Sequence, residues 1–226
     1  GGTGVVRWHL GDLNPGESGQ VILVVRVDDP LPNDTLLNNT ATISDDDGES
    51  ADDSETTTVH SAHTFVLEKY DTPDPVNPDQ IINYTLHWEV TGNEAAQNIV
   101  ITDTIPANTV FESCSGCVLY PQGYVQWNLG GDYAPGAWGD ESLQVRVDTP
   151  LPNGTVIYNN ARIRDGNDGV PVETTIDTTV ESDHELDVSK SAPSAISAGE
   201  MMTYTIQYNV TGNEPCLLYT SDAADE

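Results

Sequence analysis

The feature that most restricts the fold of this chain is a tandem repeat with a period of about 120 residues. The segment RVDDPLPN at residues 26–33 returns as RVDTPLPN at residues 146–153, an offset of 120 (146 − 26). Lys69 matches Lys190 at an offset of 121 (190 − 69). We therefore predict the C-terminal half of one repeat, one complete repeat and the N-terminal part of a third, over residues 1–60, 61–180 and 181–215.

Apolar residues alternate with polar ones inside the repeat. Tyr84, Leu86 and Trp88 stand at every second position, and so do Ile99 and Ile101. A period of two places one face of a strand in a core. About seven or eight short strands separated by turn residues, as expected for each repeat, are typical of an Ig-like β-sandwich. The prediction is an all-β chain of tandem Ig-like β-sandwich repeats.

The two ends of the sequence differ in how well they follow this pattern. Residues 5–10 and 21–27 alternate in the same way, so strands are predicted there too. The chain opens in the middle of the pattern, which indicates an internal piece of a longer protein. Residues 216–226 leave the pattern, and their back-translation resembles a transposase-based sequencing adapter. We interpret this last stretch as a sequencing artefact; the alternative is a divergent strand.

The charge of the chain excludes two classes of partner. There are 37 acidic residues against 7 basic ones, giving a formal net charge of −30. Nucleic acids and anionic membrane surfaces both require a basic footprint, which this composition does not supply. Self-repulsion of this size is tolerated where salt or divalent cations screen it. The charge favours a salt-rich or calcium-rich extracellular setting. The sequence has no run of ~18 apolar residues, so no membrane span is predicted in it.

An ordered set of short motifs suggests a family. The set runs LEKYDTPDPV, INYTLHWEVTGNEAAQNIVITDTIPANTVF, VQWNLG, APG and LQVRVDTPLPNGTVIYNNARI. It resembles the conserved Ig-like repeat of unknown function that occurs in tandem in large bacterial and archaeal surface proteins, and the likeness covers roughly residues 1–215. The resemblance implies a cell-wall, S-layer-associated or secreted multi-repeat protein, and it implies no enzymatic activity.

Acidic side chains gather in one loop and return, fewer in number, in the matching loop of the next repeat. Calcium prefers several carboxylate and carbonyl oxygens on a flexible loop. Neither loop has EF-hand spacing, so two interpretations stay open: solvated acidic turns, or calcium sites near the junction between repeats. Calcium is the one cofactor that the sequence suggests. The candidate ligands are Asp45, Asp46, Asp47, Asp52, Asp53, Asp165 and Asp168.

Both lysines, Lys69 and Lys190, are predicted to point to the apolar side of the first strand of a repeat. Lys69 shares its parity with Phe65 and Leu67, and Asn159 points inward by the same argument on a late strand. Burial of an unpaired lysine is costly and lowers its pKa. A neutral amine facing an asparagine amide beside a carboxylic acid is the chemistry of a self-formed isopeptide crosslink, as found in Ig-like domains of surface adhesins and pili. Asp103 is the candidate acid; the alternative is a lysine that reaches water from a strand end and an asparagine that closes a turn.

Cys114 and Cys117 form a single CxxC motif. A zinc site needs further ligands, and a thioredoxin-like role needs a βαβ context; the sequence offers neither. A short-range disulfide that stiffens a loop in an oxidising compartment is the preferred interpretation. No catalytic motif stands in a strand–turn–helix context. We therefore predict that this chain is not an enzyme.

Three functions fit these observations. The first is a structural stalk or spacer of a prokaryotic cell-surface or secreted protein, whose partners are neighbouring repeats of the same chain. The alternative is an adhesin-type binding module that contacts carbohydrate or a partner surface through exposed aromatic residues or acidic loops. The third, ranked last, is an accessory region of a secreted hydrolase. All three functions place the chain outside the cell. It would be at the cell surface, associated with the cell wall or S-layer, or secreted into the medium.

Overall fold

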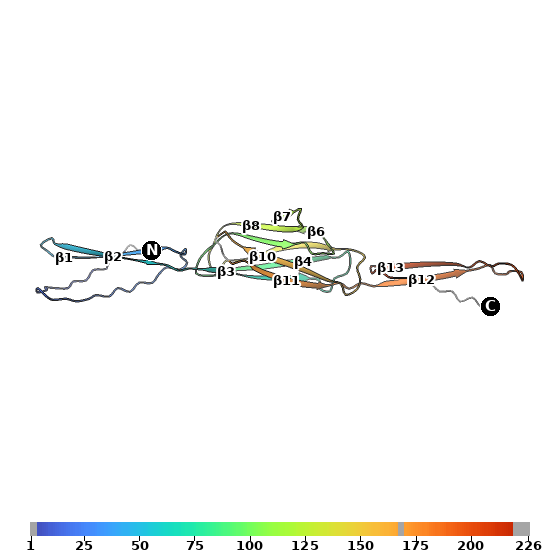
Figure 1. The fold of residues 1–226 in the computed structure, drawn as a ribbon, viewed down its shortest axis with the longest axis horizontal. Coiled ribbons are helices and arrows are strands. Elements are labelled where there is room, and N and C mark those ends of the chain that lie inside the picture. Colours follow the sequence, from blue (N-terminus) through green and yellow to red (C-terminus); the bar gives the residue numbers. More distant parts are fainter. Residues whose placement is uncertain (1–3, 167–169, 219–226) are drawn as a thin grey trace.

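β-Strands are the only regular elements in the part of the chain that the computed structural model describes, residues 4–166 and 170–218 (Figure 1). This confirms the prediction of an all-β chain. A central two-sheet sandwich lies between two two-stranded sheets, one toward each terminus, so the molecule is long and narrow. Among the described residues, no helix is long and apolar enough to cross a membrane.

Two sheets make up the central sandwich, and β-branched and aromatic residues are common in their strands. The five-stranded sheet has the order β11-β10-β5-β8-β7, and the four-stranded sheet has the order β3-β4-β9-β6. The strands of the first sheet, in that order, are Val172–Thr179, Val156–Arg164, Ala96–Thr104, Tyr124–Tyr133 and Val118–Tyr120. Those of the second are His63–Thr72, Ile81–Gly92, Trp138–Val147 and Thr109–Cys114.

The pairing of the strands brings the two ends of the repeat together. All ladders of the sandwich are antiparallel, and β10 returns from late in the chain to lie beside β5. Ala161 lies opposite Asp103 on these two strands, and Lys69 lies opposite Leu86 on β3 and β4. β5 is an interior strand, with β10 on one side and β8 on the other.

The core lies between the two sheets and contains the residues that the alternation predicts. Tyr84, Leu86 and Trp88 are 1%, 0% and 4% exposed, and Ile99 and Ile101 are fully buried. Complete burial of an aliphatic or aromatic side chain contributes about 1.5–3 kcal/mol relative to leaving it in water. This continuous apolar layer therefore holds the sandwich together.

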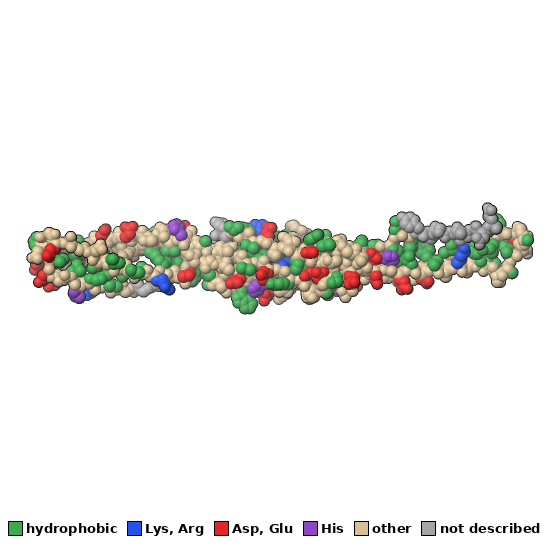
Figure 2. Space-filling model, turned by 90° about the horizontal axis from the view of Figure 1, so that it is seen from below, with side chains coloured by type: hydrophobic (Ala, Val, Ile, Leu, Met, Phe, Trp, Pro, Cys, Tyr) green, Lys and Arg blue, Asp and Glu red, His purple; other side chains and the backbone are tan. Residues whose placement is uncertain are grey.

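The flanking sheets have two strands each. Towards the N-terminus, β1 (Leu36–Ser44) pairs with β2 (Ser50–Thr58), and towards the C-terminus β12 (His184–Ser191) pairs with β13 (Thr205–Gly212). Among residues 4–166 and 170–218, no second sheet packs on either of them, and Figure 2 shows apolar side chains on the surface of both flanks. Where one repeat ends and the next begins stays a prediction.

The strands predicted at residues 5–10 and 21–27 do not form in the structure. Their counterparts in the complete repeat lie in β8 and β9, where each is paired on both sides. Leu23 is 44% exposed, whereas Leu143, at an offset of 120 (143 − 23), is 1% exposed. A strand needs hydrogen-bonded neighbours and a layer to pack against. Residues 4–60 contain no counterpart of β4 or β5, so the predicted strands stay unpaired.

Candidate functional site

Three polar side chains from three strands lie in the apolar core of the sandwich. Lys69 lies on β3, on the inward face that it shares with Phe65 and Leu67. Asp103 lies on β5 and Asn159 on β10. Asp103 and Asn159 are 0% exposed, and the side chain of Lys69 is also 0% exposed. The alternation that buries two apolar residues of β3 therefore buries an amine with them.

The strand register explains why these side chains meet. Asp103 faces Ala161, and Asn159 lies two residues earlier on the same face of β10. Asp103 and Asn159 are thus diagonal neighbours within one sheet, a spacing that side chains can bridge. Lys69 extends towards them from the four-stranded sheet, and its Nζ forms an ion pair with Oδ2 of Asp103 in the five-stranded sheet. The two sheets are therefore joined through the core by a polar contact.

Burial moves both charged groups of this pair towards their neutral forms. Loss of hydration lowers the pKa of Lys69, and the nearby carboxylate of Asp103 only partly offsets this effect. Loss of hydration raises the pKa of Asp103 to about 6, against the opposing effects of Lys69 and Asn159. A neutral amine beside a protonated carboxyl group is therefore an accessible state of the pair.

Several polar atoms of the site form no hydrogen bond of good geometry. They are Oδ1 of Asp103 and both amide atoms of Asn159. Asn159 nevertheless lies close enough to lower the pKa of Asp103, so the two side chains are within reach of each other. A buried polar atom left without a partner costs about 1–3 kcal/mol. Apolar residues would therefore stabilise this part of the core better than the three polar ones do.

Tyr84 lines the same site from β4. Its ring centre lies 4.7 Å from Nζ of Lys69, and its hydroxyl oxygen lies 3.3 Å from Oγ1 of Thr178. Thr178 in turn donates a hydrogen bond to Oδ2 of Asp71 at 2.6 Å. Burial raises the pKa of Tyr84 to about 12, so its phenol stays neutral near pH 7 and is a poor base. Among the side chains that contact the amine of Lys69, Asp103 is therefore the group suited to move a proton.

A second site is the junction between the N-terminal flank and the sandwich, here called the first junction. The backbone N–H of Asn33 donates to Oε1 of Glu94 at 2.9 Å, and the N–H of Ser61 donates to Oδ1 of Asn33 at 3.0 Å. The N–H of Ala62 donates to Oδ1 of Asn93 at 2.9 Å. The PLPN turn that ends at Asn33 is thereby fastened to the TGNE loop that ends at Glu94.

A histidine lies between two carboxylates at this junction. Nδ1 of His63 is 3.3 Å from Oε2 of Glu94, and Nε2 is 2.7 Å from Oδ2 of Asp165. The side chains of His63 and Asp165 are 2% and 0% exposed. An imidazole donates from both nitrogens only when it is protonated. Sequence reasoning assigned Asp165 to a candidate calcium set and missed this contact, since no local pattern relates the loop at residue 165 to the start of β3.

The same arrangement returns at the second junction, between the sandwich and the C-terminal flank. The N–H of Asn153 donates to Oε1 of Glu214 at 3.0 Å, and the N–H of Ser182 donates to Oδ1 of Asn153 at 3.0 Å. Nδ1 of His184 lies 2.8 Å from Oε2 of Glu214. These four residues are the repeat equivalents of those at the first junction, so both junctions are built by one motif set.

A glycine in each TGNE loop permits the close approach of the chain at the junction. Gly92 and Gly212 have φ values of 111° and 108°. A Cβ atom at either position would collide with the carbonyl oxygen of Ala62 or Asp183 respectively. Only glycine combines this backbone conformation with the absence of a side chain.

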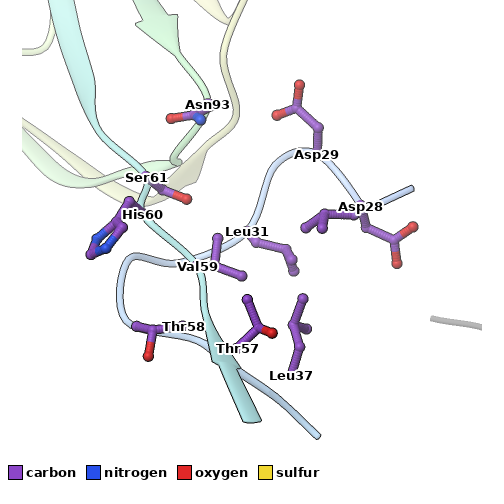
Figure 3. A pocket seen from close by; sticks show the side chains of 11 residues that line it. Asp28, Asp29, Leu31, Leu37, Thr57, Thr58, Val59, His60, Ser61 and Asn93 are labelled. Atoms are coloured by element: carbon purple, nitrogen blue, oxygen red, sulfur yellow. The ribbon is translucent and has the colours of Figure 1, made fainter. Parts of the chain in front are cut away.

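A hollow next to the first junction is shown in Figure 3. Leu31, Leu37 and Val59 point into it, beside Ser61 of the junction. The equivalents of Leu37 and Val59 in the complete repeat, Ile157 and Val180, are each 1% exposed. The hollow is therefore the open side of a core without its second layer, and we do not interpret it as a ligand site.

The structure pairs Cys114 with Cys117 in a disulfide, the pairing predicted for the CxxC motif. Both cysteines pack against the apolar core, next to the end of β6. Nε1 of Trp127 donates to the carbonyl oxygen of Ser115, inside the disulfide loop, at 2.7 Å. The disulfide thus fixes a loop that supplies a hydrogen bond to a buried tryptophan.

The candidate calcium ligands do not gather in one place in the structure. Asp45 to Asp47 lie in the turn after β1, and all three are exposed. Asp52 and Asp53 are also exposed but lie on β2, not in the predicted loop, because residues 50–58 pair with β1. Asp165 is buried against His63. Asp168 lies outside the described residues. Over residues 4–166 and 170–218, no group of three or more His, Cys, Asp or Glu side chains is arranged to hold a metal ion. Calcium binding by these loops stays a prediction.

Comparison with known proteins finds solved structures that are similar at low identity. The major pilin subunit BcpA of Bacillus cereus matches with 15% identity and a TM-score of 0.43, over 78% of this chain and 64% of that one. Domains D2 and D3 of the major pilin SpaD from Corynebacterium diphtheriae match with 12% identity and a TM-score of 0.39, over 60% and 58% of the two chains. A C-terminal fragment of the major pilin GBS80 of Streptococcus agalactiae matches with 7% identity and a TM-score of 0.35, over 57% and 58%.

These similarities carry no argument about function at such TM-scores. The chain also spans less than two thirds of the length of each of these pilin structures. No family model matches the chain, and no curated protein matches it. The resemblance to the tandem surface repeat therefore stays a prediction.

Proposed function

We propose that this chain is a structural stalk or spacer segment of a prokaryotic cell-surface or secreted protein. The observation that carries the proposal is that the same hydrogen bonds recur at the two junctions. The contacts of Asn33 with Glu94 and Ser61 recur in those of Asn153 with Glu214 and Ser182. A connection that is built twice from the same residues suits an array of repeats, because each added repeat continues the line at the same angle.

The junctions favour a stiff connection over a flexible one. Each uses backbone N–H groups as donors, so the geometry of the connecting chain itself is restricted. Glu94 and His63 are largely buried, with side chains 17% and 2% exposed, which protects their contact from water. Flexible linkers, by contrast, are rich in glycine and serine and form no fixed hydrogen bonds. The line of three units in Figure 1 agrees with this reasoning.

Two further features support a location outside the cell. The disulfide of Cys114 and Cys117 is stable in oxidising compartments and rare in the cytosol. The net charge of −30 keeps neighbouring molecules apart and is tolerated in the ionic strength of an external medium. Attachment to a cell wall or an S-layer is part of the proposal and rests on the family resemblance alone.

Small-angle X-ray scattering of the full chain tests the stalk. We expect the profile of a thin particle, with a maximum dimension that matches the extended arrangement of Figure 1. The matched pair is Asn93→Ala, which removes the acceptor of Ala62 N–H, and Asn128→Ala, on the exposed surface of β8. The first variant should broaden the distribution of dimensions and the second should not. A compact profile of the unchanged chain would refute the proposal.

An adhesin-type binding module is the second candidate, and one observation favours it. Trp138 on β9 is 65% exposed, and its ring centre lies 5.7 Å from that of His87. Exposed aromatic rings are frequent in sites that stack on sugars. A glycan array probed with the full chain and with Trp138→Ala separates the two candidates. A stalk binds nothing on the array, whereas a signal that Trp138→Ala abolishes would favour the adhesin.

A further inference from the structure

We propose that Lys69 and Asn159 become joined by an intramolecular isopeptide bond, formed by the protein itself with Asp103 as the catalytic acid and base. The inference concerns the interior of one repeat and does not depend on the proposed function. The bond would connect β3 of the four-stranded sheet to β10 of the five-stranded sheet. It would replace a buried ion pair by a neutral amide in the middle of the core.

The nucleophile is the amine of Lys69. An ammonium group has no lone pair, so the reaction needs the neutral amine. The side chain of Lys69 is fully buried, and its Nζ contacts Asp103 and lies 4.7 Å from the ring centre of Tyr84. Loss of hydration favours transfer of the amine's proton to Asp103, since the pair is then neutral. The environment of Lys69 thereby produces the reactive form.

The electrophile is the side-chain amide of Asn159. Its oxygen and nitrogen both lack a hydrogen-bond partner, and Oδ1 of Asp103 also lacks one. Once Asp103 is protonated, it has a donor to offer, and the amide oxygen of Asn159 is an acceptor within its reach. Such a hydrogen bond withdraws electron density from Cγ of Asn159 and stabilises the charge that develops on its oxygen. The carboxyl group of Asp103 and the amide oxygen of Asn159 thus become hydrogen-bond partners during the reaction.

The reaction is balanced without any added reagent. Nζ of Lys69 attacks Cγ of Asn159, and a tetrahedral intermediate forms. Asp103 accepts a proton from Nζ and delivers a proton to Nδ2 of Asn159. The Cγ–Nδ2 bond then breaks, ammonia leaves and a secondary amide remains between Nζ and Cγ. Nothing is oxidised or reduced. The proton that Lys69 gives to Asp103 before the attack remains on the carboxyl group, so Asp103 is neutral at the end and the ion pair is gone.

The fold supplies what an uncatalysed amide exchange lacks in water. The three groups are held together on strands of fixed register, which replaces a collision between molecules by a reaction within one. Water is excluded, since Asp103 and Asn159 are 0% exposed. Exclusion of water also protects the amide of Asn159 from hydrolysis to aspartate, a reaction that would compete with the crosslink.

The flanking half-repeats provide an internal comparison. Lys190 lies with its Nζ 4.2 Å from the ring centre of Tyr204, as Lys69 lies over Tyr84. The prediction that Lys190 is buried is wrong, because no second sheet among the described residues covers β12. Asn39 stands 120 residues before Asn159 (159 − 39), but it is exposed in the structure. The C-terminal flank follows the repeat pattern only to residue 215, before the position that would match Asp103. One crosslink per chain is therefore expected, at the complete repeat only.

Intact-mass spectrometry of the purified, reduced full chain tests the inference. We expect a mass lower than that of the sequence by one molecule of ammonia. Protease digestion should give a branched peptide that joins the segment around Lys69 to the segment around Asn159. Lys69→Met and Asp103→Asn should each restore the full mass of the variant sequence. The expected loss of thermal stability accompanies both variants but is not needed for the test.

Two other reactions give similar masses and are separated by the same experiment. A succinimide at Asn153–Gly154 also loses ammonia, but it opens in mild base and persists in Lys69→Met. An amide between Lys69 and Asp103 loses water instead of ammonia. The full mass of the unchanged chain, a loss of water, or a loss of ammonia that persists in Lys69→Met would each overturn the proposal. These results leave the scattering test of the stalk unaffected, so the two proposals can fail separately.

Discussion

Replacing Glu94 by glutamine tests the first junction at a single group. Glutamine keeps the shape of the side chain and can still accept from the N–H of Asn33 through its oxygen. It loses the negative charge, and its amide NH₂ is a donor where Oε2 faces His63 at 3.3 Å. Glu94→Gln therefore weakens one hydrogen bond and disrupts the contact between Oε2 and Nδ1 of His63 without creating a cavity.

The size of the effect follows from these contacts. A hydrogen bond to a charged group contributes about 1.5–3 kcal/mol and one between neutral groups about 0.5–1.5 kcal/mol, so the substitution costs about 1 kcal/mol at Asn33. Loss of the contact with Nδ1 of His63 adds to this, although the 17% exposure of Glu94 lets solvent reduce that contribution. Because about 1.4 kcal/mol corresponds to a factor of ten, we expect local opening of the junction to become roughly fivefold more frequent.

Amide hydrogen exchange measures this opening directly, since the donors are backbone N–H groups. Exchange at Asn33 and Ser61 should accelerate by roughly that factor in Glu94→Gln. Exchange at Asn153, in the second junction, should not change. Glu214→Gln is the matched control and should reverse the pattern. Equal acceleration at both junctions, or none at Asn33, would refute the assignment of Glu94 as the group that fastens this junction.

Three further predictions concern stability. Gly92→Ala should destabilise the sandwich by more than about 1 kcal/mol, because φ is 111° and the added Cβ would collide with the carbonyl oxygen of Ala62. Thermal melting checks this, with Gly130→Ala as the control, since a Cβ at Gly130 has no atom within 4 Å. In Lys69→Met the cation that lowers the pKa of Asp103 is gone, so the folded carboxyl binds its proton more tightly than the unfolded one. The stability of this variant should be highest below about pH 4 and fall as the pH rises through about 6 and beyond, and the double variant with Asp103→Asn should lack this fall. At a net charge of −30, sodium chloride should raise the melting temperature by screening; a further rise in calcium at matched ionic strength would identify calcium sites, and no rise in either salt would contradict the screening argument.

Within the central sandwich, local alternation was sufficient to predict which side chains enter the core. The directions of Lys69 and Asn159 follow from their parity with apolar neighbours, whichever strands lie beside them, and both side chains are buried. Their meeting could not be predicted in the same way, because it depends on register. Only the pairing of β10 with β5, which sets Ala161 opposite Asp103, shows that the carboxyl and the amide share one face.

The contacts at the junctions and the absence of two strands from the N-terminal flank could not be predicted from the sequence. PLPN belongs to the repeated text at residues 26–33 and 146–153, and TGNE occurs at residues 91–94 and 211–214. Nothing in either motif indicates that the two bind each other. The contact of His63 with Asp165 joins residues 102 positions apart (165 − 63), beyond any local pattern. Strands at residues 5–10 and 21–27 were predicted from alternation alone, and alternation does not ensure a neighbouring strand.

The position of Lys69 and Asn159 near opposite ends of the repeat has a mechanical consequence. A pull on the chain enters the sandwich at β3 and leaves it after β11, and these two strands lie close together. With the proposed bond in place, tension would pass from β3 directly to β10. The 89 residues between the two positions (158 − 70 + 1) would then carry no load, although unfolded they could lengthen by roughly 300 Å at about 3.4 Å per residue. A repeat of this kind would behave under force as an inextensible link.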